Sequence, residues 1–333
     1  MPQEKAAKTD NKRITPKAEL GANYILHLMA TARIVFNSDY ADKYETTIEK
    51  NDLEVLKKNK NRLTAFRSGS GEDSMADVVI GFPIAFALKS RSDYEKYFRI
   101  LDDCFDSNSM SEFQKAYSEE ISRFQKMIPF DTEELIGFAV YRELISEIGQ
   151  IIINNFQRYR TDVWPQEMEK MASVLDKLCA CFESTDHIFR WENLTGRVFK
   201  TDYFIPSLCS AIKGGPDANS IGYDRVLFYY GRPFDELVQF VSHEVGTHIL
   251  IDDYFNLLKT GKYDAGTLFM AYECLAMFYN KRILEVDETT YRLNEFPDIE
   301  FCRIYDEISD KNPDLTPPEL LVKGLEVYQS QNR

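Results

Sequence analysis

Apolar residues recur at helical spacing through most of the first 185 positions of this 333-residue chain. One stretch carries them at the intervals of an amphipathic helix: Tyr24, Ile25, Leu28, Met29, Ala32 and Val35. Such intervals place apolar side chains on one helix face, which can then pack against a core. The same spacing predicts further helices over Leu53–Leu63, Tyr94–Phe105, Ser111–Met127, Glu133–Tyr159 and Met168–Phe182. The N-terminal half is therefore constrained to a mainly helical fold.

The pattern changes after Thr195. Two segments, Arg197–Leu208 and Arg225–Tyr230, are rich in aromatic and β-branched residues and are bounded by Gly, Pro, Asp and Asn, which predicts β-strands. Helical spacing returns from Pro233, and a second long helix is expected over Leu268–Arg282. A final amphipathic helix is expected between Asn312 and Tyr328. The predicted fold class is α+β, mainly α, with a small sheet.

The length of the chain suggests about two domains. Residues 1–19 are polar and lack the apolar core of a signal peptide, so they are expected to form a disordered tail. Residues 20–190 are expected to form a helical region, and residues 191–333 a region with the strands and the motif described below. One integrated domain is the alternative.

Charge and cysteine content limit the classes of partner. The 40 Lys and Arg residues face 54 Asp and Glu residues, giving a net charge of -14, which argues against nucleic acid or an anionic membrane. The longest apolar run, Val78–Leu88, is too short to span a bilayer. Six cysteines are spread without a CxxC pair, as expected of reduced thiols. These features favour a cytoplasmic protein.

Two of the four histidines belong to one six-residue string, HEVGTH, from His243 to His248. In the zinc-peptidase motif HExxH, the histidines are four residues apart and project about 40° from each other on an α-helix. Here they are five residues apart, or about 140° on a regular helix. A π-helical turn would reduce this angle to about 50°. Because Gly246 lies between the histidines and tolerates such a distortion, the sequence predicts a widened turn there.

A catalytic zinc needs three protein ligands and an open position for water. Glu273 is the best third ligand, because it is the only charged residue between Tyr272 and Phe278 in an otherwise apolar helix. Asp252 and Asp253 are the alternatives. Glu244 is then free to act as the general base that takes a proton from the attacking water.

The string HEVGTH, followed by ECLA from Glu273 to Ala276, resembles the HExxxH zincin-like metallopeptidases. That family includes the microtubule-associated tyrosine carboxypeptidases and bacterial proteins with a QEGLA motif. The resemblance covers Arg225 to Phe278, and Cys274 replaces the glycine of EGLA. It implies that His243, His248 and Glu273 bind Zn²⁺, that Glu244 is the base, and that the catalytic domain is mainly helical with a small sheet. The resemblance also implies the C-terminal tail of tubulin as a candidate substrate.

The predicted function is a zinc-dependent metallopeptidase, of carboxypeptidase type, that removes a C-terminal tyrosine or other aromatic residue from a protein or peptide. Candidates to hold the substrate carboxylate are Lys200, Lys213, Arg225 and Arg232. Candidates to stabilise an oxyanion are Tyr223, Tyr229, Tyr230 and Tyr272. Two alternatives stay open: a non-peptidase zinc hydrolase or metal-binding regulatory protein, and a non-catalytic helical interaction module.

Overall fold

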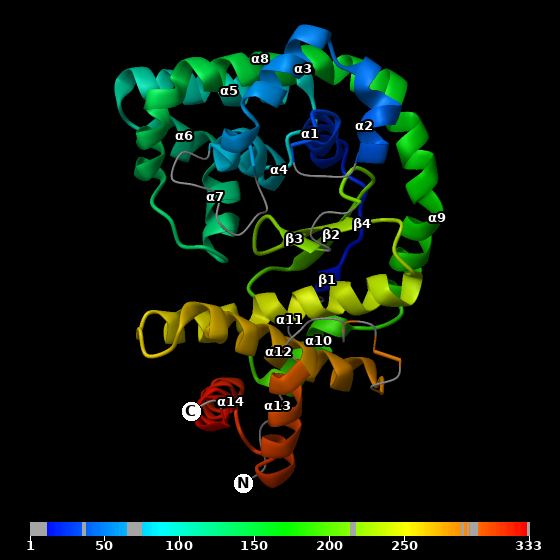
Figure 1. Cartoon of the computed structure of the whole chain (residues 1–333), viewed down its shortest axis with the longest axis vertical. Coiled ribbons are helices and arrows are strands. Elements are labelled where there is room, and N and C mark those ends of the chain that lie inside the picture. The colour runs from blue at the N-terminus through cyan, green and yellow to red at the C-terminus, as the bar shows by residue number, and fades with distance from the viewer. Residues whose placement is uncertain are drawn as a thin grey trace. The chain divides into compact units, whose positions relative to one another are not determined.

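The computed structural model describes residues 12–34, 38–64, 75–213, 218–287, 290–291, 293 and 299–331. Within them the chain is mainly α-helical and has a small mixed sheet (Figure 1). The predicted fold class, α+β and mainly α, is confirmed. Residues 1–11 of the predicted tail lie outside the described residues, whereas Arg13 and Ile14 form a short strand, β1. No helix in the described ranges has both the length and the apolar character that a membrane span requires.

The chain forms two compact units, each assembled from segments that are not consecutive. Unit 1 comprises Met1–Thr15, Ala180–Phe204 and Pro233–Arg333, and unit 2 comprises Pro16–Cys179 and Ile205–Arg232. The sequence had suggested consecutive regions meeting near residue 190. The helix α9 and the strand β2 each contribute residues to both units.

Unit 2 contains most of the helices that the apolar spacing predicts. Its α-helices are α1 (Leu20–Thr31), α2 (Ser38–Tyr44), α3 (Lys50–Lys58), α4 (Phe82–Ala85), α5 (Arg91–Ser107), α6 (Ser111–Ala116), α7 (Ser118–Gln125), α8 (Arg142–Arg158) and the first part of α9 (Trp164–Glu183). Shorter turns are 3₁₀-helical over Glu45–Thr47 and Lys60–Arg62 and π-helical over Asp77–Gly81 and Tyr159–Val163.

Helix α1 runs through the hydrophobic core of unit 2. Nearly every residue of α1 is buried, and the Tyr24 ring lies 5.2 Å from that of Phe156 on α8. The prediction of one α-helix over Glu133–Tyr159 is only partly right, because Thr132–Tyr141 is 3₁₀-helical and α8 begins at Arg142. Only Thr132 and Leu135 of that 3₁₀ segment are buried, so little tertiary packing is available to support α-helical turns.

The four strands follow the order β1-β2-β4-β3. Strand β2 (Tyr203–Cys209) is parallel to both β1 and β4 (Arg225–Tyr229), and β3 (Ala218–Ser220) is antiparallel to β4. The predicted strands are thus present, although β2 begins later than Arg197. All but the first residue of β2 are buried, which explains its nearly continuous apolar sequence.

The remaining helices belong to unit 1. They are α10 (His187–Thr195), α11 (Phe234–Leu258), α12 (Ala265–Leu284), α13 (Ile299–Lys311) and α14 (Pro317–Gln331). Helix α12 packs along α11 and also contacts α13 and α14 (Figure 1). The sequence predicted α11, α12 and α14 but not α10 or α13.

Candidate functional site

The motif helix α11 is an uninterrupted α-helix from Phe234 to Leu258. The prediction of a widened turn at Gly246 is wrong. The glycine has a different role, because a Cβ atom at this position would lie only 2.2 Å from Cη2 of Trp191 on α10. Gly246 therefore makes room for an indole ring, and the two histidines of the motif are separated by about 140° around a regular helix.

The histidines consequently have different surroundings. His243, which is 3% exposed, has its Nε2 atom 3.1 Å from Oε2 of Glu273 on α12. His248 is fully buried, and its ring lies 5.4 Å from that of Phe204 in an edge-to-face arrangement. Within the described ranges, no three His, Cys, Asp or Glu side chains are grouped closely enough to hold a metal ion. The structure brings together His243 and Glu273 but does not add His248 to them.

The environment of His243 combines burial with negative charge. Burial lowers the pKa of His243, but the hydrogen bond and charge of Glu273, together with the charges of Glu244 and Cys302, outweigh burial, so the pKa lies above its ordinary value. The Nδ1 atom is buried and has no hydrogen-bond partner among the described residues. Glu273 keeps 27% of its side chain exposed, so the pair is accessible to solvent from the Glu273 side.

His243, Thr247 and Tyr254 lie on one stripe of α11 and contact α12 in antiparallel register. The Tyr272 hydroxyl donates a hydrogen bond to the Thr247 carbonyl, and the Tyr254 and Tyr272 rings are 5.0 Å apart. The Tyr272 hydroxyl is thus engaged by the backbone of α11. We call this line of contacts, from His243–Glu273 to Tyr254–Tyr272, the α11–α12 seam.

Glu244, the predicted base, lies beside this seam and is half-buried. The Thr247 hydroxyl donates to the Glu244 backbone carbonyl at 3.0 Å and lies 3.5 Å from its carboxylate. Phe269 is 49% exposed on the same helix face as Glu273, and its ring lies 6.1 Å from that of Tyr254. The accessible part of the seam therefore combines two carboxylates with aromatic rings.

The alternative ligands Asp252 and Asp253 are engaged elsewhere. Lys200 Nζ lies 2.6 Å from Asp252, and Arg197 makes two hydrogen bonds of 2.5 and 3.0 Å to Asp253. Burial raises the pKa of Asp253, which Arg197 opposes. These side chains line an open pocket of about 480 Å³ in unit 1. Lys200, a predicted substrate-binding residue, thus neutralises a neighbouring aspartate.

Most of the other predicted substrate-binding residues belong to unit 2, where they differ in their contacts and in their burial. Lys213 Nζ lies 3.6 Å from Asp39. Arg225 is buried and bonds Glu19 at 2.9 and 3.2 Å and the Ala85 carbonyl at 2.8 Å, which indicates a structural ion pair. The remaining members differ in burial: Tyr223 is fully buried, and Tyr229, Tyr230 and Arg232 are half-buried.

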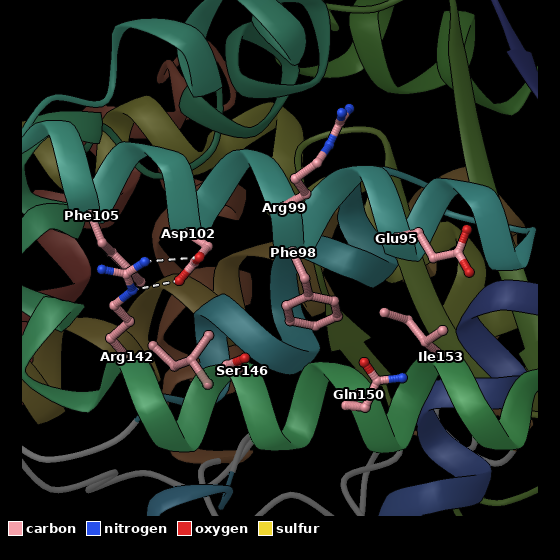
Figure 2. A pocket seen from close by; sticks show the side chains of 10 residues that line it. Glu95, Phe98, Arg99, Asp102, Phe105, Arg142, Ser146, Gln150 and Ile153 are labelled. Carbon is pink, nitrogen blue, oxygen red and sulfur yellow. Dashed lines mark hydrogen bonds and ion pairs between the residues drawn. The ribbon is translucent and has the colours of Figure 1, made fainter.

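A pocket that the sequence did not indicate lies between α5 and α8 in unit 2 (Figure 2). It has a volume of about 300 Å³. Phe98 lies in its middle, and Arg142 is held by Asp102 at 2.5 and 2.9 Å, while Arg99 points away. Arg142 is held by Asp102 and Asp106, and Glu95 pairs with Arg91, so most charged groups of this pocket have partners, and we read it as a crevice between packed helices.

Sequence reasoning also missed a buried acid, Glu167, that meets Lys43 and Lys170 in unit 2. The only sequence signal was the i,i+3 spacing of Glu167 and Lys170.

Comparisons of the chain with protein-family models, with curated proteins and with solved structures gave no significant match. The resemblance of HEVGTH and ECLA to the HExxxH metallopeptidases accordingly stays a prediction.

Proposed function

We propose that the chain is a zinc-dependent metallopeptidase, of carboxypeptidase type, that removes a C-terminal tyrosine or other aromatic residue from a protein or peptide. The observation that carries the proposal is the 3.1 Å contact between His243 and Glu273, two predicted ligands that are 30 residues apart in the chain. The sequence alone predicts both as ligands. A cytoplasmic location is part of the proposal and is supported by the dispersed cysteines.

The fit of these residues to zinc is incomplete. His243 and Glu273 suit two ligand positions, since a neutral imidazole nitrogen and a carboxylate are common zinc ligands. His248 does not suit the third position while α11 is a regular helix. A site with all three ligands would need α11 to rearrange around Gly246 and to displace Trp191.

Glu244 is the proposed general base. Its carboxylate follows His243 directly and stays half-exposed, so it can accept a proton from an attacking water molecule and pass it to the leaving amine. Thr247, which lies 3.5 Å from this carboxylate, helps to orient it.

One observation favours a second candidate, the non-catalytic helical module. In the regular α11, His243 and Glu273 can be a structural ion pair between two helices, as the raised pKa of His243 would also allow. In that case the chain has no stoichiometric metal.

Metal analysis separates the two candidates. Zinc would be measured by plasma mass spectrometry on protein purified without an affinity-tag metal, for wild type and for His243→Ala, His248→Ala and Glu273→Ala. His187→Ala is the matched control, because His187 is also buried in unit 1 but lies outside the motif. We expect about one zinc per chain in wild type and control, and none in the three variants. Absence of zinc from reconstituted wild type would overturn the proposal.

Activity distinguishes a catalytic from a structural metal. Glu244→Gln keeps the size of the side chain but removes its basicity, so it should retain zinc and lose most turnover. Release of the terminal amino acid from peptides ending in tyrosine or phenylalanine would be followed by mass spectrometry. Unchanged turnover in Glu244→Gln would exclude Glu244 as the general base. Wild-type protein that binds zinc but shows no turnover would favour a structural or regulatory metal.

A further inference from the structure

A buried carboxylate and two lysines meet where α2 approaches α9 in unit 2 (Figure 1). Glu167, in the first turn of α9, is only 2% exposed. Lys43 and Tyr44 end α2, and Lys170 follows Glu167 by one helical turn. Both lysine side chains are nearly half exposed, so the group reaches from the protein interior to solvent.

The donors converge on a single oxygen atom. The Lys170 ammonium and the Tyr44 hydroxyl both donate hydrogen bonds to Oε1 of Glu167, and Lys43 Nζ lies 3.4 Å from the same atom. Lys43 also donates to the Tyr44 hydroxyl at 2.5 Å. The two ammonium groups are thereby held close to each other.

The charges of this cluster do not balance. Two lysines share one carboxylate, so one positive charge is in excess. Burial lowers the pKa of Lys43, and the neighbouring Lys170 ammonium lowers it further, against the effect of Glu167. The single Glu167 carboxylate offsets only part of the repulsion between the two ammonium groups, and a second anion would offset the rest. In a chain of net charge -14, such an excess of positive charge is a local exception.

Neighbouring hydroxyls extend the cluster. Tyr230 is half-buried, and burial raises its pKa, which the charge of Lys170 lowers and that of Glu167 raises. The Tyr159 hydroxyl, which is also influenced by Glu167, is buried and has no hydrogen-bond partner within the described ranges.

We propose that Lys43 and Lys170 form a binding site for a small oxyanion, the phosphate or carboxylate group of a ligand. Glu167 is a positioning residue that fixes both lysines, and the anion binds at their solvent-exposed ends. Charge-assisted hydrogen bonds from both ammonium groups to the oxyanion offset the repulsion between them. The competing explanation is an ion-pair network that only ties α2 to α9, and it predicts no effect of anions on the lysines.

Lysine reactivity tests the site directly on the full chain. The protein is treated with limiting acetic anhydride in sodium chloride, sodium phosphate or sodium acetate of equal ionic strength, and acetylation at each lysine is quantified by mass spectrometry. An anion that binds between the lysines raises their pKa values, and each unit of increase reduces the fraction of reactive neutral amine about tenfold. We therefore expect roughly tenfold protection of Lys43 in phosphate or acetate.

Lys57 is the matched control, because it lies in the same unit and pairs with Glu45 at 2.8 Å. Its reactivity should be the same in all three salts. Protection in phosphate alone identifies a phosphate-bearing ligand, and protection in acetate alone identifies a carboxylate. Equal reactivity of Lys43 in all three salts would overturn the proposal.

Thermal unfolding provides a second test. A ligand that binds only the folded chain raises the unfolding temperature. The protecting anion should stabilise wild type and Lys57→Met but neither Lys43→Met nor Lys170→Met. An equal rise in all four proteins contradicts a specific site. The acetylation result decides the question if either lysine variant fails to fold. A chelator is present throughout, so the outcome is independent of zinc.

Discussion

His27 is enclosed by hydroxyls and aromatic rings in the core of unit 2. Its Nδ1 lies 3.1 Å from the Tyr40 hydroxyl, its Nε2 lies 3.1 Å from the Thr47 hydroxyl, and its ring lies 4.8 Å from that of Tyr159. Burial lowers the pKa of His27 to about 3, so the native state keeps the ring neutral at pH values where an unfolded chain protonates it.

This difference predicts a loss of stability in mild acid. Between pH 6.5 and 3 the unfolded state binds a proton that the native state does not, so stability falls as the pH falls. From pH 7 to pH 5 the contribution of His27 amounts to about 2 kcal/mol. Urea unfolding would measure the free energy of unfolding of wild type and His27→Gln at both pH values. Between pH 7 and pH 5 it should fall by about 2 kcal/mol less in the variant than in wild type. An NMR titration midpoint of His27 near its ordinary value would contradict the prediction.

Gly246→Ala should destabilise the protein although alanine is the better helix former. The added Cβ overlaps the Trp191 indole, and such overpacking costs about 1–3 kcal/mol. Gly137→Ala is the control, because no atom lies within 4 Å of the position that its Cβ would occupy. Unfolding free energies of the two variants test the prediction, and a Gly246→Ala protein as stable as wild type would refute the packing role.

The candidate site was partly predictable from single residues. Glu273 was identifiable because a lone acid in an apolar helix needs a partner, and the structure supplies His243. Gly246 was misinterpreted, because sequence shows that a glycine is present but not whether its backbone or its missing side chain matters. The indole that explains it lies 55 residues away, in a helix that the sequence did not predict.

At the scale of elements, the α11–α12 seam aligns two helices through contacts spaced along both. The Tyr272 hydroxyl is committed to the Thr247 carbonyl, which argues against its predicted role as an oxyanion donor. Tyr272→Phe should cost about 1 kcal/mol of stability, the typical value of one hydrogen bond, and leave turnover on a tyrosine-terminated peptide unchanged. Tyr254→Phe, at a half-buried residue on the same seam, is the comparison. A large fall in kcat for Tyr272→Phe alone would restore the catalytic role.

Long periodic segments made most helices predictable, since burying one face requires the helical interval. Helix α10 was missed because its nine residues are too few to display the period clearly. Helix α13 follows a polar stretch, and its apolar residues were not recognised as a separate helix. The 3₁₀ geometry of Thr132–Tyr141 depends on how little of that segment is buried, which its sequence does not reveal.

At the scale of the whole molecule, the net charge of -14 bears on the proposed substrate. An acidic peptide is repelled at long range, and salt screens the repulsion within about 10 Å at 0.1 M. Of two peptides with the same C-terminal tyrosine, the neutral one should therefore have the higher kcat/KM at low salt, and the difference should shrink as salt is added. Faster cleavage of a glutamate-rich peptide at low salt would instead reveal a local basic groove.

The sequence did not predict how the chain divides into its two units. Lys12, in the segment expected to be a disordered tail, pairs with Glu192 at 2.5 Å and donates to the Phe199 carbonyl at 2.7 Å. These partners are at least 180 residues away, and local composition carries no information about contacts at that distance. Composition therefore predicted the class of fold but not which segments join in each unit.

The fit between Gly246 and Trp191 also limits which residues homologous proteins can carry at these two positions. A residue with a side chain at position 246 is compatible only with a smaller residue at position 191, and a tryptophan at 191 is compatible only with glycine at 246. Among any homologues, the two positions should therefore change together or not at all, although 55 residues separate them. An alignment in which bulky residues occupy both positions would mean that the helices carrying them have moved apart during evolution.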